Sequence, residues 1–410
     1  MKILQLNKFY YHKGGAERYL LELSDLLTRH GHEVIPFAMA DARNIETPYS
    51  KFFVSPVETR EVKGGVIGLK TLGRMIYSFE AARKLRALLK TTRPDVAHVH
   101  NIYTQISPSV LDVLKSEGIP IVHTIHDYDL IAPNYMLWHN GRIENLSRKS
   151  LLNLTLSKFH KDSRRASFAQ ALAFKLHHWR QSYKRTVNRF LPSSDFVWNE
   201  HTARGFPRGH ASILPLFTDA VNQAPRFDDD GYVLYVGRLV PEKGVEVLLR
   251  AMQELPNVPC KIVGTGPEEI QLHIMGDRMP NVTFEGYQSG STLWDLMRGA
   301  RAIVVPSLWQ EVFGLVAIEA MALGKPVIAS DVGALSEIVA DRVSGLLVPP
   351  GSVPALKGAI ARVAEDPIFA TQLGRAGRQR AEQKYSPEGH YQKLINIYQE
   401  VIESVSGKRG

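Results

Sequence analysis

Cysteine is nearly absent from this sequence: Cys260 is the only one among 410 residues. A disulfide within the chain and a cysteine-based zinc site are therefore excluded, and a reducing compartment is expected. Long apolar runs are also missing, since no uncharged apolar stretch reaches the roughly 18 residues of a membrane-spanning helix. The first residues, Met1 to Asn7, turn polar too early for the apolar core of a signal peptide. These absences predict a cytoplasmic protein without a membrane span.

The length and composition predict two folded domains. A chain of 410 residues is too long for one ordinary core and suits two domains of roughly 150 to 200 residues each. Apolar residues make up 44% and charged residues 22%, which is typical of a globular protein and argues against a disordered or fibrous one.

Positive charge is concentrated in one segment. The net charge is +9, yet residues 142–189 alone hold twelve basic residues against Glu144 and Asp162, a local excess of +10. Large apolar residues recur there at three- or four-residue steps, which predicts a basic amphipathic helix: Phe168, Leu172, Leu176, Trp179, Tyr183, Val187 and Phe190. Such a helix either lies on an anionic membrane surface or packs on the core with its basic face in solvent.

Strand-like and helix-like stretches alternate along the chain, which predicts an α/β fold with parallel sheets. In the first half the strand-like runs are 2–6, 34–39, 95–99 and 120–125, with helical stretches at 16–29, 79–90 and 108–115. A polar, turn-rich stretch at 218–231 marks the domain boundary. In the second half the strand-like runs are 232–236, 261–263, 282–285, 302–305, 326–329 and 345–348, and a final helix is expected at 391–404.

In parallel α/β sheets, ligands bind beyond the carboxyl ends of the strands, so the strand-to-helix junctions are the candidate sites. At the first junction, Gly14 and Gly15 either let the backbone approach a phosphate or sugar or form a plain turn. At a second junction, His126 follows the fourth strand and either faces a ligand or is hydrogen-bonded within its loop. Asp127 and Asp129 lie beside it in one loop without a second cluster, so no metal site is expected.

The junction after residue 236 carries two cations. Arg238 offers a bidentate guanidinium and Lys243 a point charge, in a glycine-flanked loop that precedes a helix. A diphosphate requires both kinds of contact. The sequence therefore predicts an anion site here; the other interpretation is a pair of solvated surface cations.

The junction after residue 305 carries two glutamates. Glu311 lies in the loop before a helix, and Glu319 lies inside that helix, with seven residues between them. One can reach a sugar and the other a ribose, while the amides of Phe313, Gly314 and Leu315 face phosphate or sugar oxygens. A glutamate in an apolar helix needs a partner, which for Glu319 is either a ligand or a salt bridge to Arg238 or Lys243.

With these residues identified, the chain resembles the retaining GT-B glycosyltransferases, a family that includes mannosyl-, glucosyl- and N-acetylglucosaminyltransferases of bacterial surface polysaccharides. The likeness covers nearly the whole length. Its motifs are the Gly-Gly-Ala-Glu loop at 14–17, His126-Asp127-Tyr128, the Gly237-Arg238 loop with its lysine, Gly264-Thr265-Gly266-Pro267 and the two spaced glutamates.

The resemblance implies two Rossmann-like doubly wound domains that face each other across a cleft. Residues 1–217 would form the acceptor-side domain, with a basic insertion at about 141–190, and residues 218–385 the donor-side domain. Residues 386–410 would form a helix that returns to the first domain. The insertion lacks the cysteines that relatives with this loop often carry, so acceptor-binding residues are not transferred from the family.

The resemblance also implies the roles of the site residues. Arg238 and Lys243 would bind the donor diphosphate with Gly15 beneath it, and Glu319 would bind the ribose. The donor sugar would contact the catalytic residues His126 and Glu311 and the amides of 313–315. Gly266 would belong to the donor site, and Tyr287 would lie beside the base.

The implied reaction transfers a hexose or N-acetylhexosamine from a nucleotide-diphosphate sugar to a glycan or lipid-linked acceptor. It proceeds with retention at the anomeric carbon and without metal or other cofactor, while cations and helix amides stabilise the departing diphosphate. The expected setting is cell-surface polysaccharide or glycolipid synthesis, at the inner membrane face if residues 142–189 bind anionic lipid.

Two other functions compete with this prediction. A nucleotide-sugar 2-epimerase of the same architecture would act on the donor alone and need no acceptor. A basic nucleic-acid-binding protein would use the aromatic and basic residues of 159–189, although no recognisable nucleic-acid module is present, so nucleic acid is not an expected partner. The donor base, the donor sugar and the acceptor cannot be read from the sequence.

Overall fold

The computed structural model describes residues 1–57 and 65–407, which form two compact units. The N-terminal domain comprises Met1–His139, Glu144–Leu214 and the C-terminal helix from Tyr391 onward. The C-terminal domain comprises Pro215–His390 and the short segment Asn140–Ile143.

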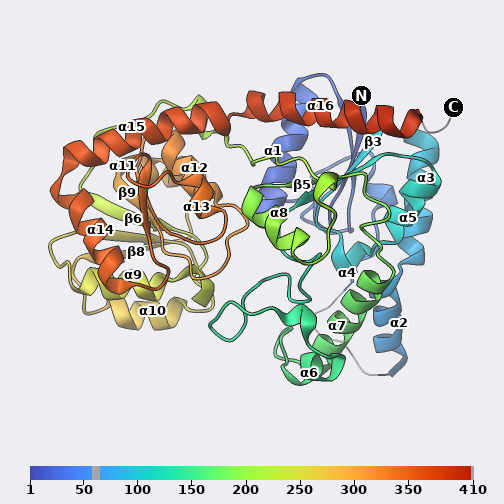
Figure 1. Cartoon of the computed structure of the whole chain (residues 1–410), viewed down its shortest axis with the longest axis horizontal. Coiled ribbons are helices and arrows are strands. Elements are labelled where there is room, and N and C mark those ends of the chain that lie inside the picture. The colour runs from blue at the N-terminus through green and yellow to red at the C-terminus, as the bar shows by residue number, and fades with distance from the viewer. Residues whose placement is uncertain (58–64, 408–410) are drawn as a thin grey trace. The chain divides into compact units, whose positions relative to one another are not determined.

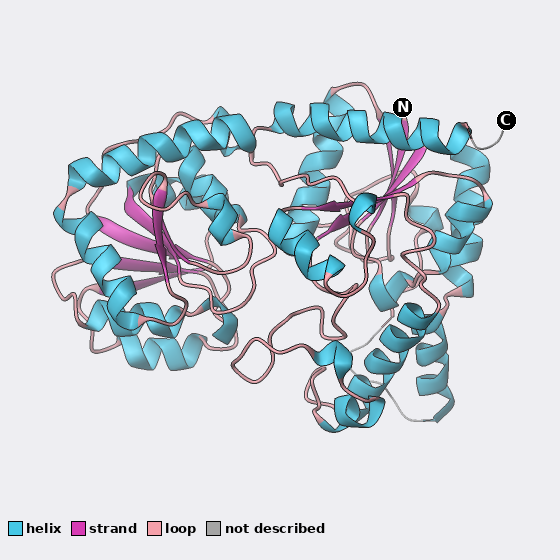
Figure 2. Cartoon of the chain, viewed as in Figure 1, coloured by secondary structure: helices cyan, strands magenta, loops and turns pink. Residues whose placement is uncertain are grey.

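The N-terminal domain is built on a five-stranded parallel sheet with helices on both faces (Figures 1 and 2). Its strand order is β2-β1-β3-β4-β5, a doubly wound order. The strands are β1 (Lys2–Leu6), β2 (Glu33–Phe37), β3 (Val96–Val99), β4 (Ile121–Ile125) and β5 (Arg189–Pro192). β3 and β4 are buried along their whole length, because a parallel sheet covered by helices on both faces favours continuous apolar runs.

The helices of this domain are α1 (Gly15–Arg29), α2 (Gly65–Ile76), α3 (Phe79–Thr92), α4 (Tyr103–Ile106), α5 (Ser109–Ser116), α6 (Leu151–Leu156), α7 (Arg164–Trp179) and α8 (Asp195–Thr202). In the first 120 residues α1, α3 and α5 begin and end within two residues of the predicted positions, whereas α2 and α4 were not predicted. Short 3-10 turns are η1 (Ser50–Phe52), η2 (Leu146–Arg148) and η3 (Arg208–His210). Ser78, Ser163 and Ser194 cap α3, α7 and α8 by accepting a hydrogen bond from the third residue beyond.

The prediction of one amphipathic helix through residue 190 is wrong. α7 ends at Trp179, and Phe190 is a core residue of β5 instead of the end of a helical stripe. The buried face of α7 is formed by small residues, among them Ala169 and Ala173, which pack against Met75 of α2. Of the predicted stripe, Trp179 is 80% exposed. Small side chains allow α7 to approach α2 closely, which the spacing of large residues does not reveal.

The C-terminal domain contains a six-stranded parallel sheet with strand order β11-β10-β9-β6-β7-β8. The strands are β6 (Tyr232–Val236), β7 (Cys260–Val263), β8 (Val282–Gly286), β9 (Ala300–Val305), β10 (Val327–Ser330) and β11 (Gly345–Val348). Counted from β6, this is the Rossmann order, in which the chain reverses its direction of winding between β6 and β9. All six strands occur where the sequence predicts them, within two residues at each end.

Helices cover both faces of this second sheet (Figure 1). They are α9 (Val245–Gln253), α10 (Glu269–Gly276), α11 (Gly290–Gly299), α12 (Leu315–Ala322), α13 (Leu335–Ile338), α14 (Val353–Glu365) and α15 (Pro367–Lys384), with 3-10 turns η4 (Asp219–Asn222) and η5 (Pro241–Lys243). The large core cluster of this domain joins α9, α14 and α15 to the sheet through Leu248, Ile360 and Leu373.

The last helix, α16 (Pro387–Ser406), belongs to the N-terminal domain from Tyr391 onward. One side of α16 is apolar and buried, with Leu394 and Tyr398 fully enclosed. The Tyr398 hydroxyl lies 2.6 Å from His98 Nδ1 of β3, and the Tyr391 ring stacks on His30. None of the helices within 1–57 and 65–407 has both the length and the apolar character of a bilayer-crossing segment.

Candidate active site

Two loops leave neighbouring strands at the winding reversal of the C-terminal domain. The β6 loop (residues 237–244) and the β9 loop (residues 306–314) are joined by a hydrogen bond from Leu308 N to Glu242 O, 2.9 Å long. Gly244 has a φ of +69°, and a Cβ added there would lie 2.0 Å from Pro306 O. Only glycine fits this close backbone contact. Ligands of Rossmann sheets bind at this edge, so the fold itself selects these two loops.

The β6 and β9 loops bring Lys243 and Glu311 together. Lys243 Nζ lies 2.6 Å from Glu311 Oε1, and the Ser307 hydroxyl donates to the same oxygen at 2.5 Å. The Glu311 side chain is only 7% exposed, so this carboxylate is held by a cation and a hydroxyl in a largely dry position. Sequence reasoning identified both charges but missed their pairing and missed Ser307.

Arg238 lies differently from Lys243. Its side chain is 72% exposed, and its Nη2 lies 3.8 Å from Glu242 Oε1, four residues further along the chain. An exposed pair at this distance contributes little to stability. Arg238 is therefore a largely exposed cation of the β6 loop, and binding an anion would cost it only this weak pair.

The second glutamate lies in α12, which begins directly after the β9 loop. Glu319 is 2% exposed, and Phe313 is buried with its ring edge-on to Tyr385. Gly314 has a φ of +151°, and a Cβ there would lie 2.8 Å from the Leu335 side chain. The amides of Leu315 and Val316 open the first turn and precede any intrahelical partner, whereas Ala317 N already donates to Gly314 O at 2.9 Å. They present donors and a partial positive charge beside Glu311.

Gly266 and Tyr287 lie on the loops after β7 and β8. A Cβ on Gly266 would lie 2.2 Å from Leu239 O, and Glu268 N donates to the same carbonyl at 3.1 Å. Gly266 is thus required for packing of the β7 loop against the β6 loop. Tyr287 is 73% exposed and follows the last residue of β8.

In the N-terminal domain the glycine pair starts a helix. Gly14 caps α1 in an extended conformation and Gly15 is its first residue, so the loop after β1 ends at a helix N-terminus. Glu17, in the first turn, is buried and accepts a hydrogen bond from Asn7 Nδ2 at 3.4 Å. A helix N-terminus of this kind favours anions, whereas a plain turn does not.

His126 follows β4 and belongs to a hydrogen-bonded row of polar side chains. Its Nε2 lies 2.9 Å from His100 Nδ1, and His100 Nε2 lies 2.7 Å from Gln5 Oε1. With a carbonyl oxygen as its partner, His100 Nε2 carries the proton and its Nδ1 accepts. His126 Nε2 then donates to His100, which leaves His126 Nδ1 as an acceptor for a hydroxyl group. Sequence reasoning missed His100 and Gln5, which occupy strand-end positions with no motif of their own.

Burial determines the charge of His126. It lowers the pKa of this ring to about 3, with the Lys8 ammonium as a smaller cause, so His126 is neutral at pH 7. Tyr19 covers one side of the ring, with centroids 5.4 Å apart. A neutral, fixed imidazole can accept a hydrogen bond from a hydroxyl group and carries no net charge that would attract an anion.

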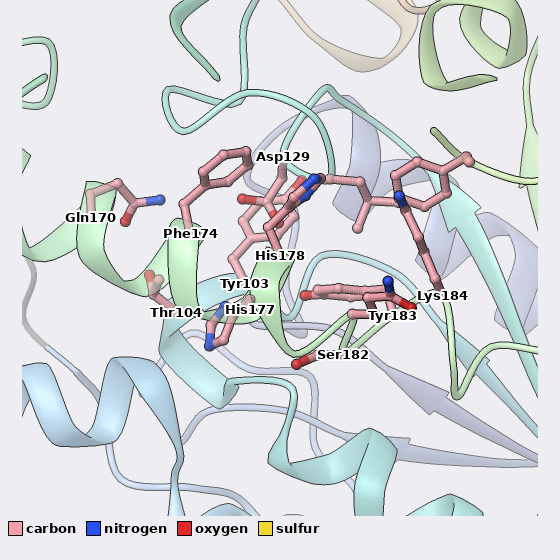
Figure 3. Close-up of a pocket in the computed structure, with 13 residues that line it drawn as sticks. Tyr103, Thr104, Asp129, Gln170, Phe174, His177, His178, Ser182, Tyr183 and Lys184 are labelled. Atoms are coloured by element: carbon pink, nitrogen blue, oxygen red, sulfur yellow. The ribbon is translucent and has the colours of Figure 1, made fainter. Parts of the chain in front are cut away.

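The same loop carries two carboxyl groups. Asp127 accepts a hydrogen bond from the Tyr103 hydroxyl and from Asp129 N. Burial raises the pKa of Asp127, and burial together with the neighbouring Asp127 charge raises that of Asp129 well above its usual range. Asp129 lines a cavity of about 30 Å³, room for little more than water, with Phe174, His178 and Tyr183 around it (Figure 3). No group of three or more His, Cys, Asp or Glu suited to a metal occurs among the described residues.

Solved structures share this fold over nearly the whole chain. Sucrose-phosphate synthase from Thermosynechococcus elongatus superposes with a TM-score of 0.73 and 23% identity, covering 98% of this chain and 99% of its own. Anabaena Alr3699/HepE in complex with UDP and glucose superposes with a TM-score of 0.65 and 19% identity, covering 97% and 99%. Two Rossmann-like domains with these neighbours define the GT-B architecture.

Sequence comparison assigns the family. Residues 13–220 match Glycosyltransferase Family 4, and residues 217–380 match Glycosyl transferases group 1. Glycogen synthase of Mycobacterium tuberculosis is 37% identical over 394 residues, which covers 90% of this chain and 86% of that protein. The chain therefore belongs to the group 1 and family 4 glycosyltransferases.

Other relatives match over a smaller share of their length. Alpha-D-kanosaminyltransferase of Streptomyces kanamyceticus is 31% identical over 200 residues, and the match covers 45% of this chain and 52% of that protein. The match to the uncharacterized glycosyltransferase MJ1607 of Methanocaldococcus jannaschii likewise covers 46% of that protein.

Proposed function

We propose that this protein transfers a sugar from a nucleoside-diphosphate sugar to a glycan or lipid-linked acceptor. The observation that carries the proposal is the Lys243–Glu311 pair at the winding reversal of the C-terminal sheet, followed in the chain by the N-terminal turn of α12. Cation, carboxylate and helix amides together match the diphosphate and the sugar hydroxyls of such a donor.

The residue roles follow from the chemistry of each group. Lys243 and the exposed Arg238 bind the donor diphosphate, and Glu311 and the amides of 313–315 hold the sugar. In the N-terminal domain, the amide of Gly15 at the start of α1 is suited to an anion, and His126 Nδ1 is suited to accept a hydrogen bond from a sugar hydroxyl. The buried Glu319 accepts hydrogen bonds from the ribose, and Gly266 and Tyr287 border the base.

The reaction proceeds with retention and without a metal. As the glycosidic bond breaks, the diphosphate gains negative charge, and a preorganised lysine and helix amides stabilise that charge more in the transition state than in the ground state. A cell-surface polysaccharide or glycolipid is the product class. The donor base is uracil, which is supported by the UDP held in the structural neighbour HepE.

A panel of nucleotide sugars tests the donor site by thermal shift. At 100 times its dissociation constant the matching donor stabilises the protein by about 2.7 kcal/mol, a shift of several degrees. Glu319→Gln is expected to reduce this shift by half or more, because a neutral amide accepts ribose hydrogen bonds less strongly. Glu246→Gln, on the exposed side of α9, is the matched control and keeps the shift. A shift in Glu319→Gln equal to that of the wild type contradicts the ribose assignment.

Incubation of the donor alone separates transfer from epimerisation. A transferase releases UDP slowly by hydrolysis and returns the remaining donor unchanged, whereas a 2-epimerase converts the donor to its isomer. Chromatography of the sugar nucleotide distinguishes these products, and isomer formation contradicts the proposal.

The insertion brings the enzyme to an anionic membrane, where the acceptor lies. Leu152 and Leu156 of α6 are 67% and 51% exposed, and residues 142–189 carry the basic excess. Each basic residue near such a surface contributes about 1 kcal/mol of attraction.

Flotation with phosphatidylglycerol vesicles tests this location. Wild-type protein is expected to float at low salt, and Leu152→Glu with Leu156→Glu is expected to lower the bound fraction at least about fivefold, because two apolar anchors become anions. Ile270→Glu, an exposed isoleucine of the C-terminal domain, is the control. Wild-type protein that stays in the pellet at low salt contradicts the membrane location.

A further inference from the structure

A roomy groove opens in the N-terminal domain on the side of the insertion. Its volume is about 420 Å³, far larger than the cavity beside Asp129. It is lined by the end of η2, the last turns of α7, the residues that follow α8 and the loop after β4. The lining residues are Ile131, Ser147, Arg148, Phe174, Lys175, His178, Trp179, Ala203 and Arg204.

The charge of this groove is one-sided, because none of its nine lining residues is acidic. Within residues 1–57 and 65–407, neither Arg148 nor Lys175 makes an ion pair. Arg204 is held by Glu200, with Nη1 2.7 Å from the carboxylate, while its Nε is enclosed and has no acceptor among the described residues. Two unpaired cations and one anchored guanidinium thus face a common space.

The helix dipoles do not create this site. α7 and α8 both end at the groove, and the carbonyl ends of helices repel anions. Cations at such ends stabilise the helices to some extent, but this explains neither Arg148, which lies on η2, nor the absence of any acidic residue. An anion in the groove would be bound by side chains alone.

The pKa of His178 is affected by the same excess of positive charge. Burial lowers its pKa, and the ammonium groups of Lys184 and Lys175 lower it further. His178 and Phe174 line both the groove and the cavity beside Asp129. A bound dianion would offset the repulsion that the two ammonium groups exert on a protonated His178 ring, and would raise its pKa.

The position relates the groove to the proposed reaction. Ile131 lines the groove five residues after His126, on the same loop, and Asp129 lines the adjoining cavity. A ligand anchored in the groove therefore lies along the loop that carries His126. Trp179, 80% exposed, offers an aromatic face at the rim for the remainder of the ligand.

We propose that this groove binds a phosphate group carried by the acceptor, through Arg148, Lys175 and Arg204. Guanidinium groups match phosphate oxygens in pairs, and an ammonium adds a point charge. The assignment of this phosphate to the acceptor rests on the proposed function, whereas the phosphate site itself rests on the residues that line the groove. The phosphate comes either from a soluble phosphorylated sugar or from a lipid headgroup.

Isothermal titration of the full-length protein at low salt tests the site. Glucose 6-phosphate is the soluble probe with glucose as its control, and phosphatidylglycerol vesicles are the lipid probe with phosphatidylcholine as control. Replacing both Arg148 and Lys175 by alanine is expected to weaken binding about a hundredfold, since each lost charged contact costs roughly tenfold. The control is Arg164→Ala with Arg165→Ala, which also removes two positive charges, from exposed positions of α7, the helix that carries Lys175. It is expected to change affinity less than about twofold.

The outcomes distinguish a soluble phosphate from a lipid headgroup, and they show whether the groove binds phosphate. Binding of glucose 6-phosphate that only the groove variant loses identifies a soluble phosphate, and the same pattern seen only with vesicles identifies a headgroup. Equal losses in both double variants, retained affinity in the groove variant, or no binding of either probe overturns the proposal. Arg148→Lys with Lys175→Arg keeps the charges and is expected to restore most of the affinity. Thermal shift with the donor is measured on the same variants, so a failure of the donor site is seen separately from a failure of the groove.

Discussion

Lys243→Ala is expected to lower kcat/KM for donor cleavage about a thousandfold, and UDP release measures it. Removing one preorganised donor from a site of developing negative charge costs roughly 100- to 1000-fold. Here a second loss is added, because Glu311 keeps its charge. Its side chain is 7% exposed and loses the ammonium that lies 2.6 Å away. An uncompensated carboxylate at this position repels the diphosphate.

A double-mutant cycle separates these two losses. Glu311→Gln keeps the shape of the side chain and removes its charge, so Lys243→Ala with Glu311→Gln no longer leaves a carboxylate without its cation. The double variant is therefore expected to be no slower than Lys243→Ala, although each single change is harmful. If the loss of kcat/KM in the double variant equals the product of the two single losses, the two residues act independently and the prediction is contradicted.

The matched control is Arg250→Ala. Arg250 is 60% exposed and pairs with Glu246 on the same helix, α9, that follows the β6 loop. The Arg250→Ala change removes one positive charge from α9 and leaves the Lys243–Glu311 pair intact. It is expected to change kcat/KM less than about twofold. A Lys243→Ala enzyme within threefold of the wild type contradicts the assignment of this lysine to the leaving group.

The fold and the site loops could be predicted because parallel strands are short apolar runs between helices. Ten of the eleven strands follow this pattern. The exception, β5, has four residues, and Phe190 within it also continues a three- and four-residue spacing that suggests a helix. Local periodicity cannot distinguish a helix from a strand at Phe190. The structure shows a strand, because Phe190 pairs with His123 of β4.

The pairing of Lys243 with Glu311 depends on strand order. The two residues lie 68 positions apart and meet because β6 and β9 are neighbours in the sheet, separated in sequence by β7 and β8. Sequence patterns indicate which segments are strands but not which strands are adjacent. The same reason explains why the contact of His126 with His100, through neighbouring β3 and β4, was not foreseen.

Acid is expected to unfold the N-terminal domain selectively, because that domain buries neutral histidines. Burial lowers the pKa of His123 and His126 to about 3 and that of His160 and His201 to about 4, and it lowers that of His100 well below its usual range. All five lie in the N-terminal domain.

The direction of the effect follows from proton binding in the two states. In the unfolded chain these rings take up protons near pH 6.5, whereas in the folded chain His123, His126, His160 and His201 do so only near pH 3 to 4. For these four rings the unfolded state therefore binds more protons between these values, and their contribution to stability falls as pH falls through that window. Each ring costs about 1.4 kcal/mol per pH unit, so the four cost roughly 8 kcal/mol at pH 5, before the opposite contribution of Asp127 and Asp129, whose pKa values are raised in the folded state.

Hydrogen exchange at pH 7.5, 6.5 and 5.5, corrected for the intrinsic rate, measures this loss separately in each domain. The N-terminal sheet is expected to lose its protection first. His201→Phe tests the cause, because His201 is fully buried among Trp198 and Phe206, where a phenyl ring fits. This change is expected to reduce the pH slope of unfolding by about one proton, while His12→Phe, at an exposed position, leaves it unchanged. Equal acid sensitivity of the two domains, or an unaltered slope in His201→Phe, would mean that groups other than the buried histidines control acid unfolding.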